Sequence, residues 1–175
     1  MIHVGIDPGV GGGIVVLRGG KVYPHPLNRL DWDSFVDLVS SIPKHGATQF
    51  AVEKIPLYIP GVPGKTQMPL SRMGKLYGSY KELLATCKMI SGTSPSSVTT
   101  VEFIPQKWQR VVGCTNPERL ERDAWKRKLR EYAAQIAKEN RWDFKPSLAT
   151  ADAFLIAYAS KLTWEAAFAS CRSRL

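Results

Sequence analysis

The chain has 175 residues, 44% of them hydrophobic, and a formal net charge of +9 at neutral pH. This length supports one well-buried core, so we expect a single domain over residues 1–175, with the core ending near 161 and a tail over 162–175. No apolar run approaches a membrane span, and we expect an intracellular protein with no membrane partner. The excess of Lys and Arg over Asp and Glu, 24 against 15, favours a polyanionic partner.

The three cysteines are Cys87, Cys114 and Cys171, and no short spacing pairs them with one another or with a histidine. This pattern argues against a zinc site. It favours structural thiols in a reducing compartment.

The first part of the chain predicts three strands. Apolar residues alternate over 2–6, and Asp7 follows them at the start of a glycine-rich turn. The apolar run 14–17 predicts a second strand, reached by a tight reversal. Residues 21–24 predict a third strand at a sheet edge, because their proline lacks a ladder donor.

The rest of the chain alternates helices with two further strands. Asp31 or Asp33 can cap a first helix that ends near residue 42, and residues 49–53 predict a buried strand ending in Glu53. The other expected elements are a long helix over 73–90, a strand over 99–104, a helical turn over 105–113, a charged helix over 118–140 and a helix after Ser147. This order predicts an α/β fold with a mixed five-stranded sheet flanked by helices on both faces.

Residues 55–69 differ in character from the rest of the chain. Their prolines and glycines preclude a regular helix, yet they carry large apolar side chains together with Tyr58 and Lys65. Such a loop can grip or wedge a nucleic acid. The alternative is a connector whose apolar residues fold back onto the core.

Two basic segments have both a structural and a DNA-binding interpretation. Lys107, Trp108 and Arg110 can contact phosphates, although packing of the tryptophan against the sheet is favoured. The block from Lys126 to Arg130 lies among acidic residues, so a solvated helix surface is the default. Its density of positive charge also suits binding along a DNA backbone.

Three acids occur at the ends of mostly apolar elements: Asp7, Glu53 and Asp152. Taken singly, such acids are common in turns and in the first turn of helices. Together they predict a carboxylate cluster that binds a hard cation such as Mg²⁺. Asp152 adds weight, because it lies on an otherwise apolar helix face, where a carboxylate needs a cation or hydrogen-bond donors.

The order Gly5-Ile6-Asp7-Pro8-Gly9, then Ala51-Val52-Glu53, then Ala151-Asp152-Ala153 resembles the RuvC-like Holliday-junction resolvases of the ribonuclease H superfamily. The resemblance runs from Ile2 to about Ser160 and includes Pro-Gln-Lys-Trp at 105–108. Actin-like ATPases share the first motif but need a second, duplicated domain, so we expect no nucleotide cofactor. The resemblance implies a ribonuclease-H-like fold, a symmetric homodimer and Mg²⁺- or Mn²⁺-dependent hydrolysis of four-way DNA junctions.

The resemblance also assigns roles to residues. It implies that Asp7 bridges two metal ions whose coordination Glu53 and Asp152 complete, one ion activating water and the other stabilising the leaving 3′ oxygen. Tyr58 falls where relatives place an aromatic residue that stacks or wedges at the junction centre. The expected phosphate contacts are Lys54, Lys65, Arg72, Lys75 and Lys107.

The sequence departs from this family at one position. Relatives usually carry a fourth metal ligand, Asp or His, three or four residues before the last acid, where this chain has Ala149 and Leu148. Either three carboxylates suffice, or another group such as Asp143 moves in, or a substitution has inactivated the site.

Three functions therefore stay open: a junction-resolving endonuclease, a catalytically impaired module that binds branched DNA, and a ribonuclease-H-like nuclease acting on structured RNA. A cytoplasmic or nucleoid location, a phage-infected cell and an organelle are all compatible with them.

Overall fold

The structure is a computed structural model that describes residues 1–9, 11–54, 70–93 and 97–172, with the side chains of 70–80 and 93 left out. Its centre is a five-stranded sheet of β1 (Ile2–Asp7), β2 (Gly13–Arg18), β3 (Lys21–Pro26), β4 (Thr48–Glu53) and β5 (Val98–Phe103). The strand order is β3-β2-β1-β4-β5, antiparallel from β3 to β1 and parallel from β1 to β5. The predicted mixed sheet is confirmed, with β1 at its centre.

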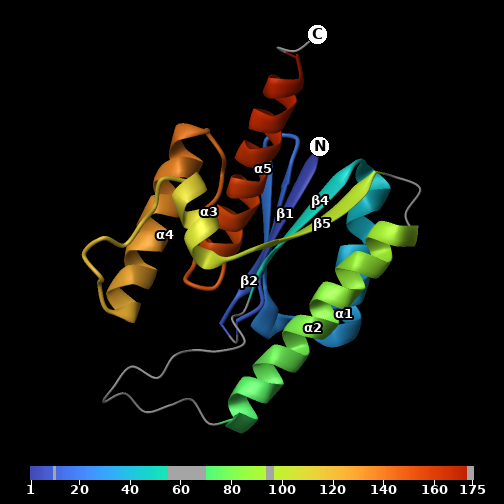
Figure 1. Cartoon of the computed structure of the whole chain (residues 1–175), viewed down its shortest axis with the longest axis horizontal. Coiled ribbons are helices and arrows are strands. Elements are labelled where there is room, and N and C mark those ends of the chain that lie inside the picture. Colours follow the sequence, from blue (N-terminus) through green and yellow to red (C-terminus); the bar gives the residue numbers. More distant parts are fainter. Residues whose placement is uncertain (10, 55–69, 94–96, 173–175) are drawn as a thin grey trace.

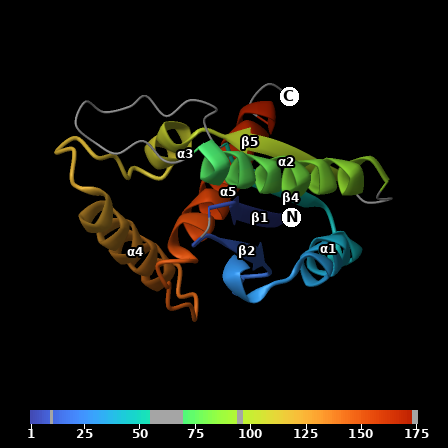
Figure 2. The same cartoon turned by 90° about the horizontal axis from the view of Figure 1, so that it is seen from below.

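Helices cover both faces of this sheet (Figures 1 and 2). One face carries α1 (Trp32–Ser41) and α2 (Leu70–Thr93), and the other carries α3 (Pro105–Val111), α4 (Arg122–Glu139) and α5 (Ala151–Arg172). The short 3₁₀ helices η1 (Leu27–Arg29) and η2 (Ile42–His45) flank α1. In the described part of the chain, no helix is both long enough and apolar enough to cross a bilayer.

The two-residue period of β1 decides which side chains meet which layer. Ile2, Val4 and Ile6 are buried in the core shared with α1 and α2. The alternate positions turn to α5: a Cβ at Gly5 would overlap α5, and His3 bonds to its Ser160. Asp7, two residues beyond Gly5, therefore lies on the α5 face.

Local sequence signals locate several elements. Asp31 caps α1, since its Oδ1 accepts a hydrogen bond from the Ser34 amide at 2.8 Å. Trp108 is only 1% exposed, so it packs in the core as favoured from the sequence.

The start of the charged helix differs from the prediction. The charged helix begins at Arg122 instead of 118, because Arg119 has a left-handed φ of 51° and Asn116 accepts a hydrogen bond from the Leu120 amide at 2.9 Å. These contacts close a separate turn before the helix. The last helix, α5, continues to Arg172 as one element, so residues 162–172 of the expected tail are helical.

Gly5 generates the first prediction. A Cβ at this position would lie 2.0 Å from the Ala153 carbonyl oxygen and 2.4 Å from the Ala157 amide nitrogen. Both are backbone atoms, so no side-chain rotation relieves the overlap. We expect Gly5→Ala to lower the free energy of unfolding by about 3 kcal/mol or more, measured by urea denaturation.

Gly92→Ala is the matched control. Gly92 lies in α2, and an added Cβ there meets no atom within 4 Å. We expect this change to be neutral or stabilising by about 0.5–1 kcal/mol. Equal stability of Gly5→Ala and the wild type would show that α5 does not pack on β1 at this distance.

Candidate functional site

The sheet brings Asp7 and Glu53 to one edge. They are the last residues of β1 and β4, which run parallel with Ile6 opposite Val52. The carboxyl ends of neighbouring parallel strands meet at the same edge. Asp7 and Glu53 also occupy equivalent positions in the two-residue period, so both face the layer that contains α5.

The glycine-rich turn after β1 fits closely around Asp7. This aspartate is 8% exposed, and its Oδ1 accepts a hydrogen bond from the Gly9 amide at 2.9 Å. A Cβ at Gly12 would lie 2.0 Å from the Asp7 carbonyl oxygen and 2.9 Å from its Cγ. The turn therefore requires glycine at position 12 in order to fold over the carboxylate.

Asp152 reaches the same edge from α5. It occupies the first turn of the helix and is 5% exposed. The close packing of Ala153 and Ala157 on Gly5 sets the helix against β1. Its first turn therefore comes to lie beside the end of that strand.

Lys126 of α4 joins two of the acids, and sequence reasoning did not single it out. Its Nζ donates a hydrogen bond to Asp152 Oδ2 and lies 3.8 Å from Asp7 Oδ2. The available signal was its spacing of three and seven residues from the buried Leu129 and Ala133. This spacing places Lys126 on the inward face of α4, unlike the exposed Arg127 and Lys128.

The ionisation of the site shows how closely its charges interact. Burial, reinforced by the charges of Asp7 and Asp152, raises the pKa of Glu53 to about 8. Burial also raises the pKa of Asp152, although Lys126 acts against this shift. For Lys126 burial acts to lower the pKa, but the carboxylates outweigh it and the net shift is upward. The three acids and the lysine thus form one electrostatic group.

The donor set of this group suits a hard divalent cation. It consists of carboxylate oxygens, and the buried Oδ1 of Asp152 has no hydrogen-bond partner. Within the described residues, no three His, Cys, Asp or Glu side chains are arranged to hold a metal ion as they stand. The cation that contacts Asp7 and Asp152 is the ammonium of Lys126.

Two of the predicted DNA contacts lie beside the acids. Lys54 is exposed directly after β4, and its amide donates to the Phe103 carbonyl oxygen at 2.8 Å. The exposed Lys107 holds its Nζ 5.7 Å from the centre of the Phe103 ring. Because Glu53 pairs with Phe103 across the sheet, both lysines lie near the carboxylate edge.

The remaining candidates are less completely placed. Tyr58 and Lys65 lie outside the described residues, and Arg72 and Lys75 belong to the first turns of α2, whose side chains are not described. At the expected fourth-ligand position, the side chain of Leu148 is 48% exposed.

Ala149 and Asp143 are the other residues considered for a fourth metal ligand. The Ala149 carbonyl oxygen would lie 2.6 Å from a Cβ at Gly13, so this backbone segment packs directly on β2. Asp143 is exposed, and in the described part of the chain no contact joins it to the three acids. The roles assigned to all these residues stay predictions.

The raised pKa of Glu53 generates a pH-dependent prediction. Without divalent ions, the Glu53 carboxyl stays protonated in the folded protein between pH 4.5 and about 8, whereas in the unfolded chain it ionises. The part of the free energy of unfolding that depends on this group is therefore highest below pH 4.5 and falls as the pH rises towards about 8. We expect Glu53→Gln, which cannot ionise, to gain stability over the wild type through this range and to keep a constant advantage above it.

Urea denaturation in EDTA across this pH range measures the effect. Glu131→Gln, at an exposed position of α4, is the control and should show no such trend. A constant difference between Glu53→Gln and the wild type at every pH would contradict a perturbed Glu53.

The contacts of Lys126 generate a prediction about metal affinity. Lys126→Ala removes the ammonium that competes for Asp7 and Asp152, so Mg²⁺ should bind about ten-fold more tightly, equivalent to ~1.4 kcal/mol. Titration calorimetry measures the affinity directly. The rise in Tm on adding Mg²⁺ should also be larger in the variant.

Lys128→Ala is the neighbouring control, because Lys128 makes an exposed ion pair with Glu118 at 3.9 Å. It should leave Mg²⁺ affinity unchanged. If Lys126→Ala weakens Mg²⁺ binding, the lysine supports the cation site and does not compete with it.

Comparison with known proteins places the fold. No family model matches the chain, and no curated protein matches it. It is similar to the solved structure of T. thermophilus RuvC in complex with a Holliday junction substrate, with a TM-score of 0.57 and 14% sequence identity. The match covers 94% of this chain and 96% of that chain. The five-stranded mixed sheet with its surrounding helices thus has the ribonuclease-H-like fold of RuvC.

Proposed function

We propose that this protein is a metal-dependent endonuclease that cuts four-way DNA junctions inside the cell. The observation that carries the proposal is the convergence of Asp7, Glu53 and Asp152 at one edge of a RuvC-like sheet. The similar solved protein is bound to a Holliday junction, and the match spans nearly all of both chains. The net charge of +9 suits a polyanionic substrate.

Asp7, Glu53 and Asp152 would hold the metal, which we propose to be two Mg²⁺ ions replaceable by Mn²⁺. Such ions supply Lewis-acid stabilisation of charge on the reacting phosphate and a water of lowered pKa. The hydrogen bond from the Gly9 amide fixes one oxygen of Asp7 and leaves Oδ2 directed towards Lys126. Asp7 is thereby oriented before any ligand binds.

Lys126 has a second role in this proposal. In this structure its ammonium contacts Asp7 and Asp152 and offsets part of their combined negative charge. With a metal ion held by these carboxylates, Lys126 would be free to pair with a phosphate oxygen beside them. Its side chain is 32% exposed, so it can make this exchange without unfolding α4.

The DNA path follows from the basic residues around the acids. Lys54 and Lys107 lie near the carboxylates, because both contact Phe103 at the end of β5. We propose that Arg72, Lys75 and Lys65 extend this contact along the backbone and that Tyr58 stacks at the junction centre. A two-fold symmetric homodimer would present two such sites to the two strands that a junction resolvase cuts.

The test is cleavage of a labelled four-way junction in Mg²⁺. We expect the wild type to produce symmetrically nicked duplexes and Asp7→Asn to reduce the rate about 100-fold or more, since each ~1.4 kcal/mol of lost transition-state stabilisation is tenfold. Asp37→Asn, at an exposed position on the opposite helical layer, is the control. Cleavage at the wild-type rate by Asp7→Asn would contradict the proposal.

A second candidate function is a module that binds branched DNA without cutting it. The exposed Leu148 at the expected fourth-ligand position favours it. In that case the wild type binds the junction tightly but leaves it intact even in Mn²⁺. Competition by structured RNA in the cleavage assay separates both DNA functions from a nuclease that acts on RNA.

A further inference from the structure

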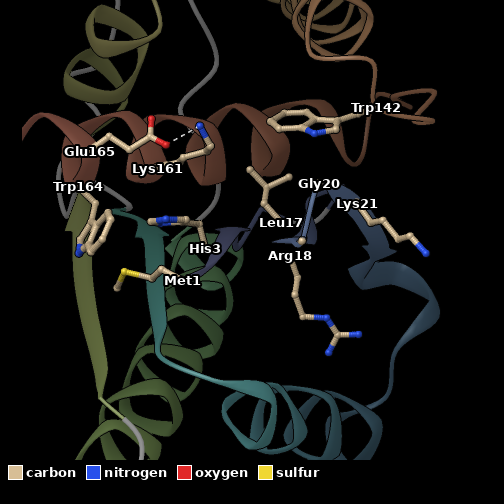
Figure 3. Close-up of a pocket in the computed structure, with 11 residues that line it drawn as sticks. Met1, His3, Leu17, Arg18, Gly20, Lys21, Trp142, Lys161, Trp164 and Glu165 are labelled. Atoms are coloured by element: carbon tan, nitrogen blue, oxygen red, sulfur yellow. Dashed lines mark ion pairs between the residues drawn. The ribbon is translucent and has the colours of Figure 1, made fainter. Parts of the chain in front are cut away.

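A cavity of about 190 Å³ lies at the end of the sheet opposite to the carboxylates. Its floor includes His3 and Leu17, from the start of β1 and the end of β2, and one side is formed by the later turns of α5 (Figure 3). Residues 152 to 165 of an α-helix span roughly 20 Å, which separates this cavity from Asp152. The cavity is therefore a different place on the molecule from the candidate nuclease site.

Two tryptophans stand on opposite sides of the cavity (Figure 3). Trp142 is anchored edge-to-face on Phe154, with ring centres 5.8 Å apart. Trp164 meets the His3 ring at 6.2 Å and stacks on Phe168 at 5.2 Å with an interplanar angle of 12°. Trp164 and Phe168 are 36% and 47% exposed, so α5 presents a stacked aromatic pair to solvent.

Basic side chains surround these rings. Arg18 holds its guanidinium 5.2 Å from the Tyr23 ring centre, and Lys161 pairs with Glu165 at 2.8 Å. Arg18 and Lys21 make no ion pair within the described part of the chain. The lining thus has three basic side chains against one acidic side chain, which suits an anion.

The polar floor of the cavity adds no charge of its own. His3 Nδ1 is hydrogen-bonded to Ser160 Oγ at 3.1 Å, and the Ser160 hydroxyl donates to Gln49 Oε1 at 2.6 Å. Burial, together with nearby positive charge, lowers the pKa of His3 to about 4. The imidazole is therefore neutral at pH 7 and is held in a fixed orientation under the ligand space.

Aromatic rings beside basic side chains that make no ion pair are suited to binding a nucleotide. A base stacks on the rings and the cations pair with phosphate, as on platforms for single-stranded nucleic acid. The volume suits one ring-sized group, because a cavity of about 150 Å³ already holds benzene. Beyond the cavity, Arg172 lies 5.0 Å from the Phe168 ring centre and continues the pattern along α5.

We infer that this face binds a single-stranded nucleic acid, with one base against Trp164 in the cavity and its phosphates paired with Arg18 and Lys21. The strand continues along the exposed side of α5 over Phe168 towards Arg172. This binding needs no divalent ion and does not rest on the proposed cleavage.

The test measures fluorescence anisotropy of labelled twelve-residue oligothymidylate in EDTA at low salt. EDTA prevents metal-dependent cleavage, so the outcome of this binding measurement is independent of the outcome of the junction-cleavage assay. We expect Trp164→Ala to weaken binding about ten-fold or more, as expected for loss of one stacked base. The pair Arg18→Glu and Lys21→Glu should weaken it further and reduce its dependence on salt.

Matched controls lie on the other helical layer. Trp32 is an exposed tryptophan of α1 stacked on Phe35, and Lys88 is an exposed lysine of α2. Trp32→Ala and Lys88→Glu should bind the oligonucleotide as the wild type does. Circular dichroism and urea denaturation establish that the Trp164 and Arg18 variants are folded.

The outcomes separate the possible ligands. Loss of binding in the cavity variants, with duplex of the same sequence bound equally by all variants, supports the inference. If both cavity variants bind the oligonucleotide as tightly as the wild type does, the inference is wrong. It is also wrong if the variants lose affinity for duplex DNA to the same extent as for the single strand. Thymidine monophosphate that competes as strongly as the oligonucleotide would assign the cavity to a free nucleotide and overturn the strand proposal. A change of oligomeric state in Trp164→Ala with unchanged binding would make this face a subunit interface instead.

Discussion

The close contact between α5 and β1 at Gly5 is the constraint on which the rest of the structure depends. A helix can approach a strand this closely only where the strand has no side chain, and α5 meets Gly5 through the backbone of Ala153 and Ala157. The contact fixes the position of the whole helix along the strand. It sets Asp152 beside Asp7 at one end and Ser160 beside His3 at the other.

The contact of α5 with β1 also makes the candidate site electrostatically unfavourable, because it brings Asp152 close to the other acids. Three carboxylates approach one another in a largely buried place, and burial with mutual repulsion raises the pKa of Glu53. Lys126 relieves part of this cost by contacting two of the acids. A bound cation would lower this electrostatic free energy, because it would offset the mutual repulsion of the carboxylates.

Much of the fold and of the site was predictable because it rests on short-range pattern. Alternating apolar residues predicted β1 and a buried apolar run predicted β4, with Asp7 and Glu53 at their ends. Asp31 or Asp33 was predicted to cap α1, and the structure shows that Asp31 does so. Lys126 was not predicted, because in a run of basic residues the local signal is a solvated surface. Its inward direction depends on where α4 packs, which is a tertiary property. The cavity under Trp164 was missed for the same reason, since it joins residues from both ends of the chain.

The distribution of the cysteines has a practical consequence. Cys87 and Cys114 are 0% and 5% exposed, and burial raises the pKa of both thiols. Cys171 is exposed near the outer end of α5. A maleimide dye or nitroxide applied to the native sequence should therefore attach at one position. The protein thus carries its own attachment point for a spectroscopic reporter, one turn of helix beyond the stacked aromatic pair.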